Sequence, residues 1–302
     1  GEGGKEALVR AAASLLDKAP ELITDEDARS LFRDQGGCEL VCDCVLSAGG
    51  NAQAAASALS ALALLSERER DAAVLLSHVG GKALVQVLAW MQGLQAEKGL
   101  RTKAAIAVEM AMQHEKVRRA LVGKTWAYTP PGGKESHKVS VLSAACSLLQ
   151  LGGAEAETLA AGVLTNLAYE DKGKEGLTAC EEPRIAPACI SMAQRGVAGG
   201  IKALLNLSTH PPFRRQLAAE AGSLKGLVGV LDKASDTDTA EALMGLMANL
   251  SLDDDLAGGL VEAGAVASAQ KRLGVRKATV QCRLLDQRFA SLVARLAKVP
   301  AG

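Results

Sequence analysis

The chain is poor in aromatic side chains and in long apolar runs. Among its 302 residues the aromatic ones are Phe32, Trp90, Trp126, Tyr128, Tyr169, Phe213 and Phe289. No apolar run reaches the length of a membrane span, and the first residues, GEGGKEALVR, lack the apolar segment of a signal peptide. We therefore expect a cytoplasmic protein without membrane insertion. Its core must be filled by Ala, Leu and Val, and the abundance of Ala and Leu favours helices.

The chain also has no excess of charge of either sign. A formal net charge of zero provides no general attraction to nucleic acid or to an anionic membrane, so we expect neither as a partner. Charge is nevertheless uneven near the C-terminus. Residues 234–270 contain seven acidic residues and no Lys or Arg, whereas residues 271–298 contain eight basic residues and one acid, Asp286. Adjacent solvated faces that neutralise each other explain such blocks.

No motif for catalysis or for a bound cofactor is visible. The seven cysteines are Cys38, Cys42, Cys44, Cys146, Cys180, Cys189 and Cys282. They form no regular framework, and Cys38, Cys42 and Cys44 have no His nearby, so we interpret them as buried reduced thiols rather than zinc ligands. Gly132-Gly133-Lys134 lacks the rest of a phosphate-binding loop. We expect no enzymatic activity, no cofactor and no metal.

What the chain does contain is a repeat. The pair Asn166-Leu167 returns at Asn206-Leu207 and at Asn249-Leu250, at intervals of 40 and 43 residues. Gly222 and Gly264, which break the helical pattern, stand 42 residues apart. Each unit reads as a short helix, a Gly break and two longer helices. The third helices are centred near Leu15, Leu64, Met110, Asn166, Asn206, Asn249 and Val293.

A three-helix unit of this length resembles the armadillo repeat. The resemblance implies an all-α, right-handed superhelical solenoid of about six to seven repeats. We expect one domain over residues 1–302, with an incomplete repeat at 1–18, an inserted loop at 124–138 and basic capping helices at 271–302.

The resemblance also implies where a partner binds. In peptide-binding armadillo proteins such as importin-α, an Asn on each third helix hydrogen-bonds the backbone of an extended ligand, and Asn166, Asn206 and Asn249 match that position. An amide both donates and accepts, which suits a peptide backbone. The alternative is that these side chains brace neighbouring helices or face water.

The residue that accompanies this Asn in importin-α is different here. A Trp four residues earlier, which flanks Lys side chains of the ligand, is replaced by Gly162, Lys202 and Gly245. We therefore do not expect a receptor for basic nuclear signals, because the aromatic shelf is absent and Lys202 repels a basic peptide.

Four segments resemble the UCS family of myosin-directed chaperones. They are GGKAL at 80–84, KAA at 103–105, PG at 131–132 and LTNL at 164–167. The chain departs from that family at Pro130, where an aromatic usually precedes the Pro, and in its scarcity of aromatics. The resemblance implies a scaffold or chaperone for an extended segment of a motor-like client. The alternative is a structural subunit of a large assembly, such as an axonemal or organellar complex.

The loop at 124–138 is the last candidate site. It interrupts the repeat with Pro130-Pro131 and Gly132-Gly133, and it contains Trp126 and Tyr128. Aromatic residues on an inserted, non-helical loop predict a partner contact. The alternative is that both rings fold back over apolar surface of the neighbouring repeats.

Overall fold

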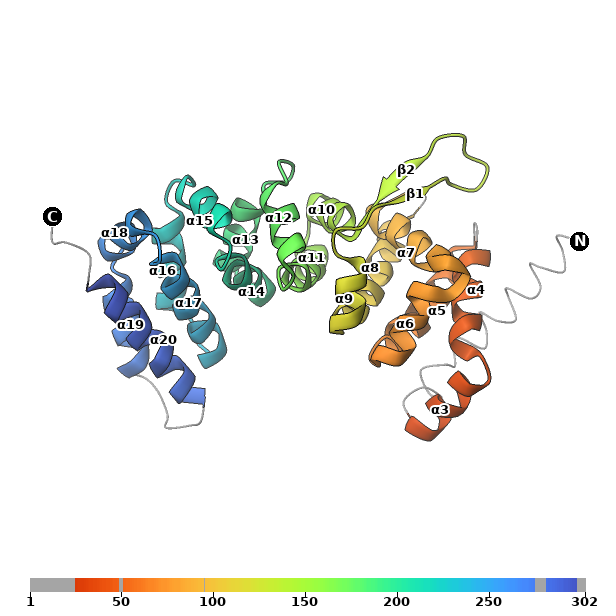
Figure 1. Ribbon diagram of the computed structural model, residues 1–302, viewed down its shortest axis with the longest axis horizontal. Helices are drawn as coiled ribbons and strands as arrows, with labels where there is room; N and C mark the ends of the chain where they lie inside the picture. Colours follow the sequence, from red (N-terminus) through yellow and green to blue (C-terminus); the bar gives the residue numbers. More distant parts are fainter. Residues whose placement is uncertain (1–24, 49–50, 95, 275–280, 298–302) are drawn as a thin grey trace, which may run out of the picture. The chain divides into compact units, whose positions relative to one another are not determined.

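The computed structural model describes residues 25–48, 51–94, 96–274 and 281–297, most of which lie in helices (Figure 1). The chain divides into two compact units, residues 1–166 and 167–302. Each unit contains three repeats of three helices in its described part. The segment 1–18, with the third helix expected near Leu15, lies outside the described residues.

The three helices of a repeat recur in a constant order. The first helices are α3 (Glu26–Asp34), α6 (Glu69–Ser77), α9 (Glu115–Leu121), α12 (Asp171–Thr178), α15 (Pro211–Ala218) and α18 (Asp254–Glu262). The second helices are α4 (Gly37–Ser47), α7 (Lys82–Gln92), α10 (Val141–Leu151), α13 (Ile185–Gln194), α16 (Ser223–Lys233) and α19 (Ala265–Gly274). The third helices are α5 (Ala52–Leu65), α8 (Lys98–Met112), α11 (Ala154–Leu167), α14 (Ala198–Leu207), α17 (Thr237–Leu250) and α20 (Gln281–Leu296).

Local sequence explains where these helices begin. Several second helices follow a glycine with positive φ, as at Gly36, Gly81 and Gly222, a conformation that costs glycine little. Third helices begin at polar caps: the Asn51 side chain accepts from the Ala54 amide, and the Asp236 side chain accepts from the Thr239 amide. Single residues therefore determine where the second and third helices begin.

Helices of the same kind pack against one another from repeat to repeat. In the first unit α5 packs on α8, and α4 and α10 both pack on α7. In the second unit α14 packs on α17, and α17 packs on α20. Among the second helices of this unit, α13 packs on α16, and α16 packs on α19. Small residues such as Ala58, Ala104 and Ala203 are fully buried in these contacts, which lets the helices approach closely.

Arginines on the first helices connect successive repeats. Arg29 lies 3.2 Å from Glu67, and Arg33 lies 3.4 Å from Asp71. In the second unit the buried Arg214 donates from Nε to Asp253 at 2.7 Å and from Nη1 to the Ser208 carbonyl at 3.1 Å. Part of the acidic block at 234–270 thus has structural roles, because Asp236 caps a helix and Asp253 pairs with Arg214.

One stretch corrects the expectation that no apolar run reaches the length of a membrane span. Glu69–Gln92 is long and apolar enough to cross a membrane by length and composition. It is divided, however, by the 3₁₀ turn η1 (His78–Gly81), in which Val79, Gly80 and Gly81 have positive φ. The stretch consists of the two short helices α6 and α7, each of which packs into the repeat stack. Neither is long enough to span a bilayer by itself.

The inserted segment at 124–138 is non-helical, as predicted, but it contains two strands that the sequence did not indicate. Strands β1 (Trp126–Tyr128) and β2 (His137–Val139) pair antiparallel, with Trp126 opposite Val139 and Tyr128 opposite His137 (Figure 1). The segment is therefore a β-hairpin, and both strands contact α7.

Candidate functional site

The candidate site is the third-helix face, which we define as the surface formed by α5, α8 and α11 in the first unit and by α14, α17 and α20 in the second. The two parts are described separately. The face presents Ile106, which exposes 37% of its surface, and the exposed Lys202. A face with exposed apolar and charged groups suits a protein partner better than a small metabolite.

The three predicted Asn residues all lie near the ends of third helices, but they differ in environment. Asn166 is buried, and its amide donates to the Glu109 carbonyl of α8 at 3.4 Å. Asn249 is half-buried and donates to the Ser208 hydroxyl at 2.9 Å. Asn206 is half-buried on α14. The contacts of Asn166 and Asn249 favour the bracing alternative, because the NH2 group of each amide donates to the preceding repeat.

The helix register extends this row into earlier repeats. The caps of the following first helices are Arg68, His114, Glu170, His210 and Asp253. Counting back four residues from each cap gives Leu64 and Met110 before the three Asn positions. One turn earlier stand Ser60 and Ile106, in register with Gly162, Lys202 and Gly245. The Asn row is thus confined to the later repeats.

The two glycines in this register make room for charged side chains. A Cβ at Gly162 would clash with the carboxylate of Glu109, and a Cβ at Gly245 would stand 3.3 Å from the Arg288 guanidinium carbon. An acid therefore lies over α11 in the first unit, and a base lies over α17 in the second. Burial raises the pKa of the Glu109 carboxyl. Sequence reasoning identified both glycines as missing Trp positions and overlooked the charges that cover them.

Lys103 is a second charged group that sequence reasoning missed. Its ammonium donates to the Ser60 hydroxyl of α5 at 2.7 Å. Within the described residues neither Lys103 nor Glu109 forms an ion pair. An ammonium has three donors, so one hydroxyl leaves most of its hydrogen-bonding capacity unused.

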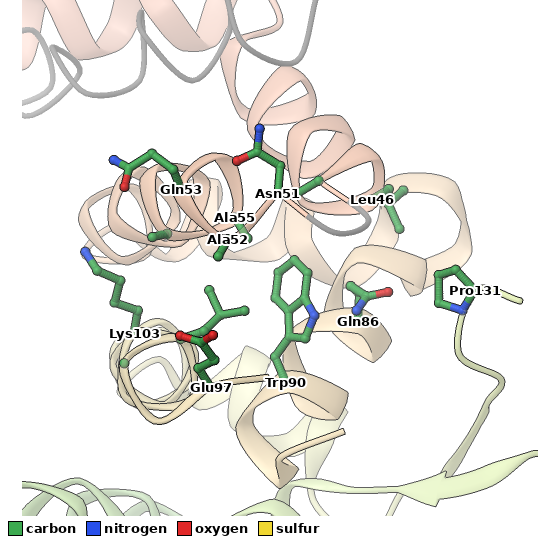
Figure 2. A pocket seen from close by; sticks show the side chains of 14 residues that line it. Leu46, Asn51, Ala52, Gln53, Ala55, Gln86, Trp90, Glu97, Lys103 and Pro131 are labelled. Atoms are coloured by element: carbon green, nitrogen blue, oxygen red, sulfur yellow. The ribbon is translucent and has the colours of Figure 1, made fainter. Parts of the chain in front are cut away.

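A cavity of about 630 Å³ opens beside Lys103 (Figure 2). Its walls come from the end of α4, from the starts of α5 and α8, from α7 and from Pro131 of the hairpin. Figure 2 shows the Trp90 ring facing the space between α5 and α8, with Lys103 at one end and Pro131 at the other. Leu46, Ala52 and Leu100 add apolar surface. No pattern in the sequence pointed to this cavity, because its walls come from five separate segments.

The hairpin residues behave differently from each other. Tyr128 is buried, and its hydroxyl accepts a hydrogen bond from Gln86 Nε2 of α7 at 3.1 Å. Trp126 is half-buried. For Tyr128 the packing alternative is favoured, since its ring and hydroxyl are both used within the fold, whereas Trp126 retains some accessible surface.

Among the described residues, the cysteines form neither a disulfide nor part of a metal-ligand cluster. Cys38, Cys42, Cys44, Cys146 and Cys189 are buried, and Cys180 is half-buried. Burial raises the pKa of Cys38, Cys42 and Cys189 to about 12 in each case. Cys282 lies on α20, where its side chain is outside the described residues.

No protein-family model matches the chain, and no curated protein matches it. Solved structures do match it. A designed armadillo repeat protein is 17% identical with a TM-score of 0.61, covering 80% of this chain and 94% of that one. A designed armadillo repeat protein in complex with a (KR)4 peptide is 16% identical with a TM-score of 0.64, covering 84% and 98%.

A third structure comes from work on a phosphorylation switch that controls the interaction between cadherin and beta-catenin. It is 15% identical with a TM-score of 0.70 and covers 98% of this chain, which spans 57% of the other. At these identities the likeness shows the fold. The predicted class, an all-α fold of armadillo-type three-helix repeats, is confirmed.

Proposed function

We propose that the protein is a non-enzymatic interaction scaffold that holds an extended segment of a partner protein on its third-helix face. The observation that carries this proposal is the pair of half-buried charges, Lys103 and Glu109, which face neighbouring third helices without a counter-ion among the described residues. Partly desolvated charges cost free energy when they are unpaired, so half-buried residues in this state are candidates for binding.

The solved structures support the class of partner. Two of them are described by their binding of a peptide or by a protein interaction, namely the designed repeat protein with a (KR)4 peptide and the cadherin and beta-catenin structure. Stacked repeats offer a long row of side chains, which suits an extended segment. For the second unit we propose a partner that is not basic, because Lys202 and Arg288 repel cations.

The remaining expectations are part of the same proposal. We propose that the protein acts in the cytoplasm, without a cofactor, and that it binds neither nucleic acid nor membrane. Its overall neutrality supports the exclusion of nucleic acid.

The test is selection from random peptides displayed on phage, with the full chain immobilised. A matched variant combines Lys103→Met with Glu109→Gln, which removes both charges at similar volume. The control combines Lys172→Met with Glu175→Gln on α12, where both side chains are exposed. We expect enriched peptides that bind the parent and the control and bind the matched variant at least about tenfold more weakly. No enrichment, or equal binding to all three, contradicts the proposal.

A more specific form of the proposal is a myosin-directed chaperone of the UCS type, which rests on the sequence segments at 80–84, 103–105, 131–132 and 164–167. Such a chaperone suppresses the aggregation of a heat-denatured myosin motor domain at near-equal protein concentrations. The alternative is a structural subunit of a large assembly, which leaves aggregation unchanged and co-purifies with its complex. Light scattering of the motor domain with and without the chain distinguishes the two.

A further inference from the structure

We propose that the cavity beside Trp90 receives a large apolar side chain of the partner segment, while Lys103 binds a carboxylate of the same segment. The inference rests on the proposed function, and it defines the partner as an extended segment in which an acidic residue lies near an aromatic or large aliphatic one. The site is separate from the Asn row, because it is formed at the beginnings of α5 and α8.

The size and lining of the cavity favour an apolar side chain. A volume of about 630 Å³ is larger than any single side chain, so the cavity also has room for part of the backbone of the segment. Leu46 and Leu100 are half-buried and supply apolar surface that a ring or aliphatic chain would cover, and the buried Trp90 adds the small part of its ring that is exposed. Removing such a side chain from water favours binding in proportion to the apolar area that becomes covered.

The charge beside the cavity favours an acid. Lys103 is half-buried, and within the described part of the chain its ammonium donates to the neutral Ser60 hydroxyl. The carboxylate of Glu97 also lines the cavity, but Glu97 is exposed, where water screens its charge. A partner carboxylate therefore gains more from Lys103 than it loses to Glu97.

The surroundings of Lys103 connect the cavity to the rest of the third-helix face. Ser60, which Lys103 contacts, stands in the same register as Ile106 and Gly162. A segment that runs from the cavity across Lys103 therefore continues toward Ile106, which is exposed. At the opposite end Pro131 of the hairpin lines the cavity (Figure 2).

The experiment starts from the peptides that the displayed library yields on the full chain. Their shared motif is expected to contain Asp or Glu near Phe, Trp, Tyr, Leu or Met. The best peptide is synthesised with a fluorescent label, and its Kd is measured by anisotropy. Lys103→Glu is expected to weaken binding by about tenfold or more, and exchanging the acid of the peptide for Lys is expected to restore it. Lys172→Glu, an exposed lysine of α12, serves as the control and is expected to leave Kd unchanged.

A second variant tests the cavity itself. Ala56 lines the cavity and is half-buried, so Ala56→Phe fills it with a ring. We expect about tenfold weaker binding, whereas Ala73→Phe, an exposed alanine of α6, has no effect. Thermal unfolding establishes that both variants are folded. If Ala56→Phe does not fold, the charge exchange between Lys103→Glu and the peptide still tests the proposal.

Trp90 reports occupancy directly. The chain has two Trp residues, so Trp126→Phe leaves Trp90 as the single fluorophore, and its emission is expected to shift when the peptide binds. Peptides whose binding depends on Glu109 but not on Lys103 or Ala56 overturn the cavity assignment and leave the scaffold proposal intact. Failure to select any peptide overturns both.

Discussion

At the scale of single residues, one side chain often serves both the fold and the proposed binding face. Asn166 and Asn249 each donate to the preceding repeat, to the Glu109 carbonyl and to the Ser208 hydroxyl, respectively. The sequence places these residues correctly on third helices but says nothing about such contacts, because a contact across repeats depends on how the helices pack. The two roles separate by their effects on stability and on binding.

Replacing Asn166, Asn206 and Asn249 together by Ala is expected to weaken peptide binding and to lower the free energy of unfolding by about 1–3 kcal/mol in total. The estimate follows from the modest net value of each hydrogen bond. Urea unfolding and anisotropy measure the two quantities on the same sample. Unfolding that is several kcal/mol easier, with Kd unchanged, would assign these residues to bracing alone.

Arg214 is expected to contribute more to stability than any exposed arginine. It is buried and bonded to Asp253 and to the Ser208 carbonyl. Arg214→Ala leaves both acceptors without this donor, so we expect a loss of about 1.5–3 kcal/mol, the range for hydrogen bonds to charged groups. The neighbouring Arg215 is exposed, and Arg215→Ala is the control, with a change within about 0.5 kcal/mol. Equal effects of the two substitutions would contradict the coupling between repeats that we assign to Arg214.

The buried thiols are expected to resist alkylation in the native protein. With their pKa raised to about 12, roughly one in ten thousand of the Cys38, Cys42 and Cys189 thiols is ionised at pH 8, and the thiolate is the reactive form. Cys180 is half-buried and is expected to react first with iodoacetamide, as read by peptide mass mapping. Cys180→Ser removes that early product. Equally fast modification of Cys189 in the folded protein would show that its site opens readily.

At the scale of elements, helix positions are predicted well and strands are not. The third helices expected near Leu64, Met110, Asn166, Asn206 and Asn249 coincide with α5, α8, α11, α14 and α17. Their period is set by apolar spacing and by single glycines, which are local signals. Strands β1 and β2 have three residues each, too few to show an alternating pattern, and they form by packing on α7.

Tyr128 is expected to contribute more to the stability of the fold than the tip of the hairpin does. Tyr128→Ala removes a buried ring and its bond to Gln86, so we expect a loss of about 3 kcal/mol or more. Replacing the tip, residues 129–136, by a short Gly-Asn turn is expected to leave the unfolding midpoint nearly unchanged, because residues 131–136 are exposed. Calorimetry compares the two variants, and a tip replacement that destabilises as much as Tyr128→Ala would contradict this division.

The same hairpin contains Trp126. A role in contacting a partner and a role in packing against the neighbouring repeats predict different fluorescence for this residue. In a Trp90→Phe background, acrylamide is expected to quench Trp126 readily in the free protein and less readily with bound peptide. Trp126 that is shielded from the outset would assign the residue to packing.

At the scale of the whole molecule, repetition explains both what the sequence reveals and what it conceals. The fold class is evident from the sequence because the same pattern recurs along the chain. The cavity and the charges over Gly162 and Gly245 are concealed, because each is formed by residues from different repeats. In the sequence the charged residues of this face look like ordinary surface residues. Only the packing of the third helices shows that Lys103 contacts the Ser60 hydroxyl and that Glu109 and Arg288 lie beside glycines of the neighbouring third helix.

The central claim is that partners bind along the third-helix face and the cavity beside it, rather than the exposed surfaces of the first and second helices around Val261 and Leu40. A photo-reactive phenylalanine analogue placed singly at Ile106 of α8, Leu40 of α4 or Val261 of α18 distinguishes these surfaces, since all three residues are exposed. After irradiation with the selected peptide, we predict a covalent adduct from Ile106 and none from Leu40 or Val261. Adducts from Leu40 or Val261, with none from Ile106, would contradict the account.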